Sequence, residues 1–273
     1  DPVIIQSWAD GGTIDVDGTL ATTGSNNLSL RAGGEITATS LGRINVVDGD
    51  LDIRGNADAV GDPIAASGSF DGVDLDGGDG SVMIETSGTG NITIIGNAGP
   101  TSGVGVLIRE AEAIQSTATG ASAGTITITG TSPSSRGIQM DPAVITSVDG
   151  DITITATSNS TTNSEGMEIR SSSSITSTGT GANAANITLI GTSGTGTSSD
   201  ATGMAVDMSG NISAVDGDIA ITGTSRTTGS GAAGVEIKGS GGIITTGDGN
   251  ITITGTGSTA VGAGSSNGIE ITD

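Results

Sequence analysis

The 273-residue sequence contains no cysteine, no histidine and no tyrosine, and only one tryptophan and one phenylalanine. Disulfides are therefore excluded, and the side chains most often used for acid–base and nucleophilic catalysis are missing. A thick, irregular core is also excluded, because ordinary globular cores depend on aromatic residues and leucine. A thin core of stacked isoleucine and valine remains open, since β-branched residues suit strands.

Basic residues are scarce as well. Eight Lys and Arg stand against 30 Asp and Glu, which gives a formal net charge of −22. This balance argues against nucleic acid as a partner, because binding it requires a basic surface that neutralises phosphates. An anionic membrane surface is disfavoured for the same reason, and no apolar run approaches the roughly 18–20 residues that span a bilayer. We expect no nucleic acid, no membrane insertion, and an acidic surface suited to an extracellular or cell-surface location.

What the sequence has in abundance is a repeat. A glycine followed by an apolar–x–apolar pair recurs through the second half of the chain. The copies begin at Gly105, Gly137, Gly166, Gly203, Gly234 and Gly268. Each period contains two further stretches in which apolar and polar residues alternate, a pattern typical of half-buried strands. The second stretches are expected to start at Ile114, Ile145, Ile175, Ile212 and Ile244. The third stretches start at Ile126, Ile152, Ile187, Ile219 and Ile251.

Variation in length is concentrated in the loop that follows each third stretch. This loop is rich in Ser, Thr and Gly, and none of its copies could form the amphipathic helix of a βαβ unit. Short corners with one variable loop per turn are typical of a coil. The sequence therefore predicts an all-β fold: a parallel, right-handed β-helix or β-solenoid with three short strands per coil and about nine coils.

We expect one continuous domain with three parts. Residues 1–56 form compact N-terminal coils, residues 57–80 form an acidic Gly/Asp-rich insertion or irregular coil, and residues 81–273 form the regular solenoid with coils of about 32 residues. The first strands are expected near Ile14, Ile36, Val73, Val106, Ile138, Met167, Met204, Val235 and Ile269. At about 4.8 Å between strands, the rod would be on the order of 40 Å long. The chain has no initiator Met and ends on a first strand, so we expect it to belong to a longer rod or to pair head to tail.

Two N-terminal stretches resemble the repeats of filamentous-haemagglutinin-type exoproteins. They read Gly12-Thr13-Ile14-Asp15-Val16-Asp17-Gly18-Thr19-Leu20 and Asn27-Leu28-Ser29-Leu30-Arg31-Ala32-Gly33-Gly34. The later Gly-Asp/Asn-Ile-Thr-Ile-Thr-Gly strands are similar to the same repeats, so the resemblance covers nearly the whole chain. It implies the surface β-helix of a large bacterial adhesin secreted through an outer-membrane partner. It transfers no binding residue, because the repeats carry no shared site.

The outward position that closes the first strand is charged in successive coils. It reads Asp76, Arg109, Asp141, Arg170, Asp207 and Lys238. Stacked in register, these six would form a column of alternating sign, in which each opposite pair contributes roughly 0.2–1 kcal/mol. We interpret the column as a structural charge ladder that favours the correct register. The alternative is a strip that binds or cleaves carbohydrate.

Sharp turns with the sequence Asp-Gly-Asp or Asp-Gly-Asn precede four of the third strands. Their acidic residues are Asp48, Asp50, Asp149, Asp151, Asp216, Asp218 and Asp248. Asp, Gly and Asn are common in sharp turns for steric reasons, while carboxylate oxygens are also ligands for Ca²⁺. We interpret these stretches as plain turns and keep weak calcium sites as the alternative. No cofactor is required by the sequence, and calcium is the one that it would allow.

The third strands carry two columns of outward threonines. The first contains Thr93, Thr127, Thr153, Thr188 and Thr252, and the second Thr129, Thr155, Thr222 and Thr254. Such arrays on flat solenoids can bind ice, but threonine is also simply a good exposed strand residue.

Three functions are open to such a rod. The leading hypothesis is an extracellular structural β-solenoid of a surface filament, sheath or stalk, whose partner is itself, head to tail or laterally, or the rest of a longer chain. The alternative is an adhesin segment that binds a glycan or a neighbouring cell surface, although its long loops contain no aromatic residue to stack on a sugar. An enzyme acting on polysaccharide is least favoured, because no carboxylate pair stands apart from the turn aspartates.

Overall fold

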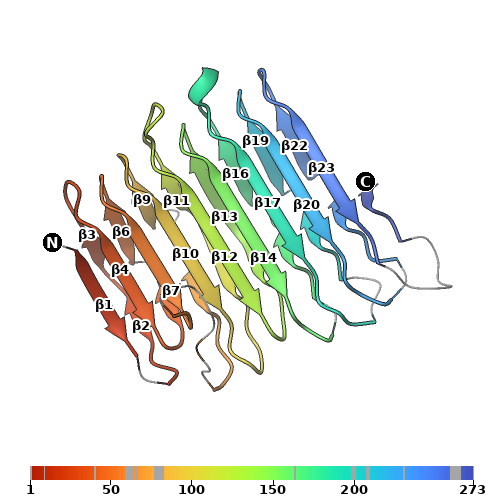
Figure 1. The fold of residues 1–273 in the computed structure, drawn as a ribbon, viewed down its shortest axis with the longest axis horizontal. Coiled ribbons are helices and arrows are strands. Elements are labelled where there is room, and N and C mark those ends of the chain that lie inside the picture. Colours follow the sequence, from red (N-terminus) through yellow and green to blue (C-terminus); the bar gives the residue numbers. More distant parts are fainter. Residues whose placement is uncertain are drawn as a thin grey trace.

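The computed structural model describes residues 2–8, 10–39, 41–58, 64, 67–76, 83–162, 164–197, 201–206, 210–229, 231–258 and 266–272. Within these ranges the chain forms 24 strands and one short 3₁₀ helix, η1 (Gly181–Asn183). The strands build two facing sheets in which each recorded pairing between strands is parallel (Figure 1).

The front layer in Figure 1 is a nine-stranded sheet, which contains the third strand of each coil. In spatial order its strands are β1 (Val3–Ser7), β4 (Leu28–Ala32), β7 (Leu51–Gly55), β10 (Ile92–Asn97), β12 (Ile126–Ser132), β14 (Ile152–Ser158), β17 (Ile187–Thr192), β20 (Ile219–Thr224) and β23 (Ile251–Thr256). The strand numbers are not consecutive because each strand pairs with the equivalent strand of the next coil. The strands numbered in between belong to the other sheet.

The back layer is a 15-stranded sheet that holds the first and second strands of the coils. The first strands are β2 (Ile14–Val16), β5 (Ile36–Ala38), β8 (Val73–Asp76), β11 (Val106–Ser116), β13 (Ile138–Ser147), β15 (Met167–Ile169), β18 (Met204–Val206), β21 (Val235–Lys238) and β24 (Ile269–Thr272). The separate second strands are β3 (Thr19–Ala21), β6 (Arg43–Val46), β9 (Ile84–Thr86), β16 (Ser174–Ser177), β19 (Asn211–Ala214) and β22 (Gly242–Thr245). In β11 and β13 the first and second strands of the coil run on without a break.

This arrangement confirms the predicted parallel β-solenoid with three strands per coil. The nine first strands begin at the nine residues expected from the sequence. One register was predicted wrongly: Ile212 pairs with Ile243 and not with Ile244, whose side chain points outward and is 49% exposed. Two neighbouring isoleucines fit the apolar pattern equally well there, but adjacent residues of a strand face opposite sides and only one can enter the core.

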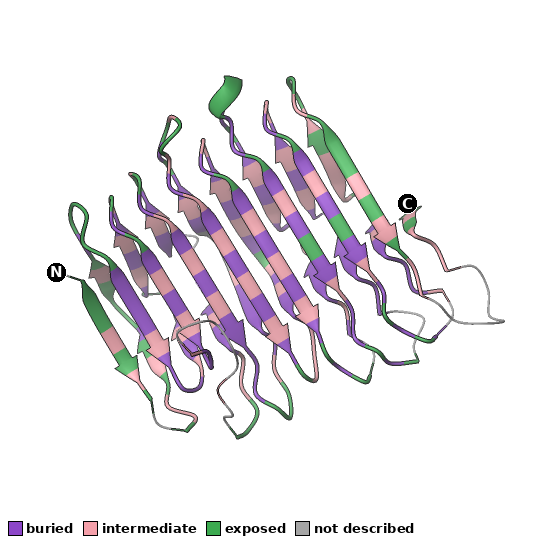
Figure 2. Cartoon of the chain, in the orientation of Figure 1, coloured by how far each residue is buried: buried purple, intermediate pink, exposed green. Residues whose placement is uncertain are grey.

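The core is a single column of stacked aliphatic side chains between the two sheets. It runs without interruption from Val16 to Ile237, and fully burying each Ile, Leu or Val contributes about 1.5–3 kcal/mol. Burial weakens toward the last coil, where the inward side chains of Ile251 and Ile271 are 42% and 70% exposed (Figure 2).

Glycine is required where the chain leaves the nine-stranded sheet and enters the next first strand. A Cβ atom at Gly130 would lie 2.2 Å from the carbonyl oxygen of Gly137, and one at Gly137 would lie 2.4 Å from the main-chain nitrogen of Thr157. No side chain fits at such distances, so close contact between backbones explains why each repeat begins with glycine.

Candidate functional site

Two of the predicted cross-coil charge pairs are present on the outer face of the 15-stranded sheet. Arg109 in β11 is in register with Asp76 in β8, with 3.6 Å between Nη1 and Oδ2. Arg170 contacts Asp141 of the preceding coil, with 2.7 Å between Nε and Oδ2. Burial raises the pKa of Asp141, but hydrogen bonds from Ser171 and Arg170 outweigh it and the pKa lies below its ordinary value. These pairs join neighbouring coils, as expected of side chains that favour the register.

The remaining two positions of the predicted ladder differ from these pairs. Asp207 lies outside the described residues. Lys238 contacts Glu236 of its own strand, with 2.8 Å between Nζ and Oε1. Glu236 is one of three acidic side chains on this face that were not foreseen from the sequence.

The missed side chains lie two residues before the ladder on the same outer face. Their contacts with the ladder are Arg109–Asp74 at 3.9 Å, Arg170–Glu168 at 3.6 Å and Lys238–Glu236 at 2.8 Å. We call the ladder and these three residues together the charged strip. The period of two along a strand was a sufficient signal, because residues i and i+2 share a face.

Glu168 is the most buried member of the charged strip, with 8% of its surface exposed. Burial raises its pKa, while Arg136 and Arg170 oppose the rise. Arg136 lies 3.1 Å from Glu168 and 2.9 Å from Glu165. A network of this kind neutralises a buried acid between coils.

The second aspartate of each Asp-Gly-Asp turn bonds to the next coil. Asp50 accepts a hydrogen bond from the main-chain nitrogen of Asn91 at 3.0 Å, and Asp151 accepts one from that of Asn186 at 2.8 Å. The side-chain Nδ2 atoms of the same two asparagines donate to the same carboxylate oxygens, at 2.9 and 3.1 Å. Each carboxylate therefore provides a hydrogen-bond acceptor for a main-chain nitrogen in the next coil.

Asparagine and aspartate alternate along this corner of the solenoid. Asn27 accepts a hydrogen bond from the Asp50 nitrogen at 2.9 Å, and Asn186 accepts one from the Asp218 nitrogen at 2.9 Å. We call the resulting cross-coil series the Asx ladder. It consists of two bonded runs, Asn27, Asp50, Asn91 and Thr125 in the first and Asp151, Asn186, Asp218 and Asn250 in the second. Within each bonded step, an amide separates successive carboxylates and removes like-charge repulsion between coils.

The first aspartate of each turn also accepts main-chain hydrogen bonds from neighbouring coils. Asp149 accepts one from Gly120 at 2.6 Å, and Asp216 accepts one from Gly181 at 2.6 Å and one from Asp248 at 3.1 Å. Asp48 accepts one from Thr89 at 3.1 Å. The hydrogen bonds from Gly181 and Asp248 hold the pKa of Asp216 below its ordinary value. Carboxylate oxygens that would ligate a calcium ion already accept hydrogen bonds from main-chain amides. Calcium binding at these turns stays a prediction.

A different acidic cluster, not foreseen from the sequence, lies near the N-terminal end of the back sheet. Glu35 precedes β5, while Asp71 precedes β8 and Asp74 lies within it. Their carboxylate oxygens lie within 4.8 Å of one another, the one such trio of potential metal ligands among the described residues. Burial, together with the charges of Asp71 and Asp74, raises the pKa of Glu35 to about 7. Burial likewise raises that of Asp74 to about 6, against the opposing charge of Arg109.

The cluster was not foreseen because Glu35 and Asp71 are far apart in the sequence. The repeat pattern blurs between Asn56 and Gly80, so the pattern did not show that these two residues lie in neighbouring coils. The cluster is chemically a proton acceptor near neutral pH, since three carboxylates so close together cannot all ionise freely.

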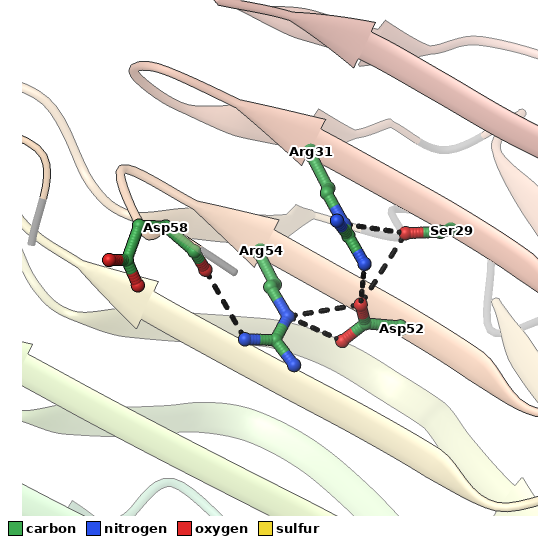
Figure 3. Close-up of polar contacts among 5 residues, drawn as sticks. All are labelled: Ser29, Arg31, Asp52, Arg54 and Asp58. Atoms are coloured by element: carbon green, nitrogen blue, oxygen red, sulfur yellow. Dashed lines mark hydrogen bonds and ion pairs between the residues drawn. The ribbon is translucent and has the colours of Figure 1, made fainter. Parts of the chain in front are cut away.

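A basic cluster lies on the outer face of the nine-stranded sheet (Figure 3). Arg31 and Arg54 both contact Asp52, at 3.2 Å and 2.7 Å, and Arg31 Nε also donates to Ser29 at 3.0 Å. Beside it is an open groove of about 510 Å³ whose lining includes Arg31, Arg54 and Asn91. Asp50 and Asp52 line the same groove, so its two guanidinium groups are balanced by two carboxylates and it is less acidic than the molecule as a whole.

The predicted threonine columns lie on the same outer face, farther along the rod. Cross-strand pairing places Thr127, Thr153 and Thr188 in one column and Thr129 and Thr155 in the next. Ala220 and Ile190 interrupt the columns, as the sequence indicated. The structure adds a third column that the sequence analysis missed, formed by Thr131, Thr157, Thr192, Thr224 and Thr256.

Comparison with known proteins adds no family to this description. A scan against protein-family models, a search of curated proteins and a search of solved structures each find no match. Within the described ranges, no helix has the length and apolar character needed to cross a membrane.

Proposed function

We propose that this chain is a stiff extracellular rod, a structural segment of a surface filament, sheath or stalk. The observation that carries the proposal is the use made of its polar side chains. In the Asx ladder and the charged strip they bond one coil to the next. Polar contacts between neighbouring coils stabilise the strand register and the stacking of coils along the length of a rod.

The continuous core supports the same function. Each coil buries its aliphatic side chains mainly against the coils above and below it, so bending the rod would open core contacts and parallel hydrogen bonds at once. A net charge of −22 keeps such a surface hydrated and soluble.

Adhesion to a glycan is a second candidate because of the groove beside Arg31 and Arg54. Sugar hydroxyls would find hydrogen-bond donors on Arg31 and Arg54 and acceptors on Asp50 and Asp52 in the same groove. A glycan array probed with the wild type and with Arg31→Ala tests this function, and binding lost in the variant supports adhesion.

The extracellular location is tested by treating intact producing cells with a protease and identifying the peptides that are released. We expect peptides of this chain to appear before those of cytosolic marker proteins. Peptides of this chain that appear only after lysis would contradict the proposal.

A further inference from the structure

An uncharged surface lies on the outer face of the nine-stranded sheet. We call it the threonine face and define it by the outward residues of β12, β14, β17, β20 and β23. Its three columns are Thr127, Thr153, Thr188, Ala220 and Thr252; Thr129, Thr155, Ile190, Thr222 and Thr254; and Thr131, Thr157, Thr192, Thr224 and Thr256. β10 extends it with Thr93 and Ile95.

The side chains of this face make no polar contact inside the molecule. In the described part of the chain, none of the threonine hydroxyls on it takes part in a hydrogen bond, whereas other outward polar groups bond between coils, as Thr176 and Ser213 do. Ile190 is 36% exposed on the same face. The face therefore presents methyl groups and unengaged hydroxyls at the regular spacing of the strands.

We infer that the threonine face pairs with the same face of a second copy of this chain, so that two rods associate side by side. The pairing rests on the structural role proposed above and specifies how such rods would join laterally. Identical β-branched side chains stacked in register on a flat sheet can interdigitate with those of a facing sheet, about 10 Å away, as in a steric zipper.

The lack of charge on the threonine face allows a second copy to bind there. Two molecules of charge −22 repel each other, but the fifteen positions of the three columns carry no charged residue. Pairing through this face therefore places no like charges against each other within the columns.

The two edges of the face carry complementary charges. Asp151 and Asp218 of the Asx ladder lie at the edge where the strands begin, and Arg226 follows β20 at the edge where they end. The guanidinium group of Arg226 donates to the neutral oxygens of Asn159 and Ser193. A twofold axis parallel to the rod would run the facing strands in opposite directions. It would bring Arg226 of each copy toward the aspartate edge of the other.

The area sets the strength of the pairing. Six strands spaced about 4.8 Å apart, each about six residues long, give roughly 600 Å² per copy or about 1,200 Å² for the pair. This value lies at the lower end of specific interfaces. A weak, concentration-dependent dimer of the single chain follows.

The first experiment is sedimentation velocity of the purified chain over a range of concentrations, at low and high salt. We expect the weight-average sedimentation coefficient to rise with concentration, and more so at high salt, which screens the net charge. Thr155→Asp places a carboxylate inside the interface and should weaken dimerisation by at least about tenfold, because a buried charge there has no partner. Thr176→Asp, on β16 of the opposite sheet, is the matched control and should dimerise as the wild type does.

The second experiment uses the absence of cysteine. Thr155→Cys should form a disulfide-linked or maleimide-bridged dimer, whereas Thr176→Cys should not. A chain that stays monomeric at all concentrations would overturn the inference, and so would a dimer that Thr155→Asp leaves unchanged. Monomers that bind ice or crystalline cellulose through this face would overturn it as well. Rods found at the cell surface but monomeric in solution would refute the lateral pairing and leave the structural function standing.

Discussion

Asp218 and Asn250 occupy the same corner of successive coils and are joined by two hydrogen bonds to one carboxylate oxygen. The Oδ1 atom of Asp218 accepts from the main-chain nitrogen of Asn250 at 2.7 Å and from its Nδ2 atom at 3.1 Å. Both bonds hold the pKa of Asp218 below its ordinary value. The same arrangement recurs between Asp151 and Asn186, so these aspartates act as connectors between coils.

Replacing Asp151 with alanine removes both bonds to Asn186. We expect a loss of about 1–2 kcal/mol in the free energy of unfolding, measured by urea denaturation. Asp151→Asn should lose less, because its Oδ1 can still accept from the main chain. Equal losses in the two variants would contradict the connector role of this carboxylate.

Removing divalent ions tests whether the turns also hold calcium. If the amides satisfy the turn carboxylates, the melting temperature of the wild type should be the same in EDTA and in millimolar Ca²⁺. A melting temperature that rises with added Ca²⁺, and no longer does so in Asp216→Asn, would instead assign calcium to the turns.

Replacing Arg170 with alanine tests the charged strip. The change removes the partner of Asp141 and one of two cations near the buried Glu168. We expect a loss of about 1–3 kcal/mol in unfolding free energy. Adding Glu168→Gln to the same chain should restore part of the loss, because it removes the acid that was left under-neutralised. A double variant less stable than Arg170→Ala would show that Glu168 was not the source of the cost.

The acidic cluster predicts a dependence of stability on pH. Glu35 and Asp74 have pKa values of about 7 and about 6 in the folded protein, against ordinary values of 4.5 and 3.8. The folded state therefore binds more protons than the unfolded state between these values. The stabilisation is complete below about pH 4 and is lost as the pH rises through about 6 to 7. The charge of Asp71 strengthens the effect by raising both pKa values, whereas the charge of Arg109 opposes it at Asp74 without reversing it.

Glu35→Gln should flatten this profile and stabilise the protein at pH 8. We expect a gain of about 1–2 kcal/mol there, after allowance for solvent screening of partly exposed groups. Urea unfolding at pH 5, 6, 7 and 8 measures it. A wild type that becomes steadily more stable from pH 5 to pH 8, with the variant parallel to it, would contradict the raised pKa of Glu35.

Glycine at the start of the repeat can be tested by adding one methyl group. Gly137→Ala forces a Cβ against the main chain of Thr157 and should cost more than about 1–3 kcal/mol. Gly18→Ala is the control, because no atom lies within 4 Å of its added Cβ. Equal stability of the two variants would show that the close backbone approach is not needed.

The sequence predicted the fold well because the same alternation of apolar and polar residues recurs from coil to coil of a solenoid. The nine first strands, from Ile14 to Ile269, follow from alternation with period two. The charged strip at Asp74, Glu168 and Glu236 was within reach of the same rule. The pairing of Ile243 was not, because Ile244 fits the alternation equally well. The cluster of Glu35 and Asp71 was also out of reach, because these residues are far apart in the sequence and the repeat pattern between them blurs. Hydrogen bonds of the Asx ladder likewise require the register of the corners, which the sequence alone does not fix.

Immunogold electron microscopy of intact producing cells, with an antibody raised against this chain, tests whether it forms a structural rod at the cell surface. We expect gold particles in lines or sheets along a filament, sheath or stalk outside the cell envelope. Gold confined to the cell interior, or absent from the surface of cells that demonstrably produce the protein, would contradict it.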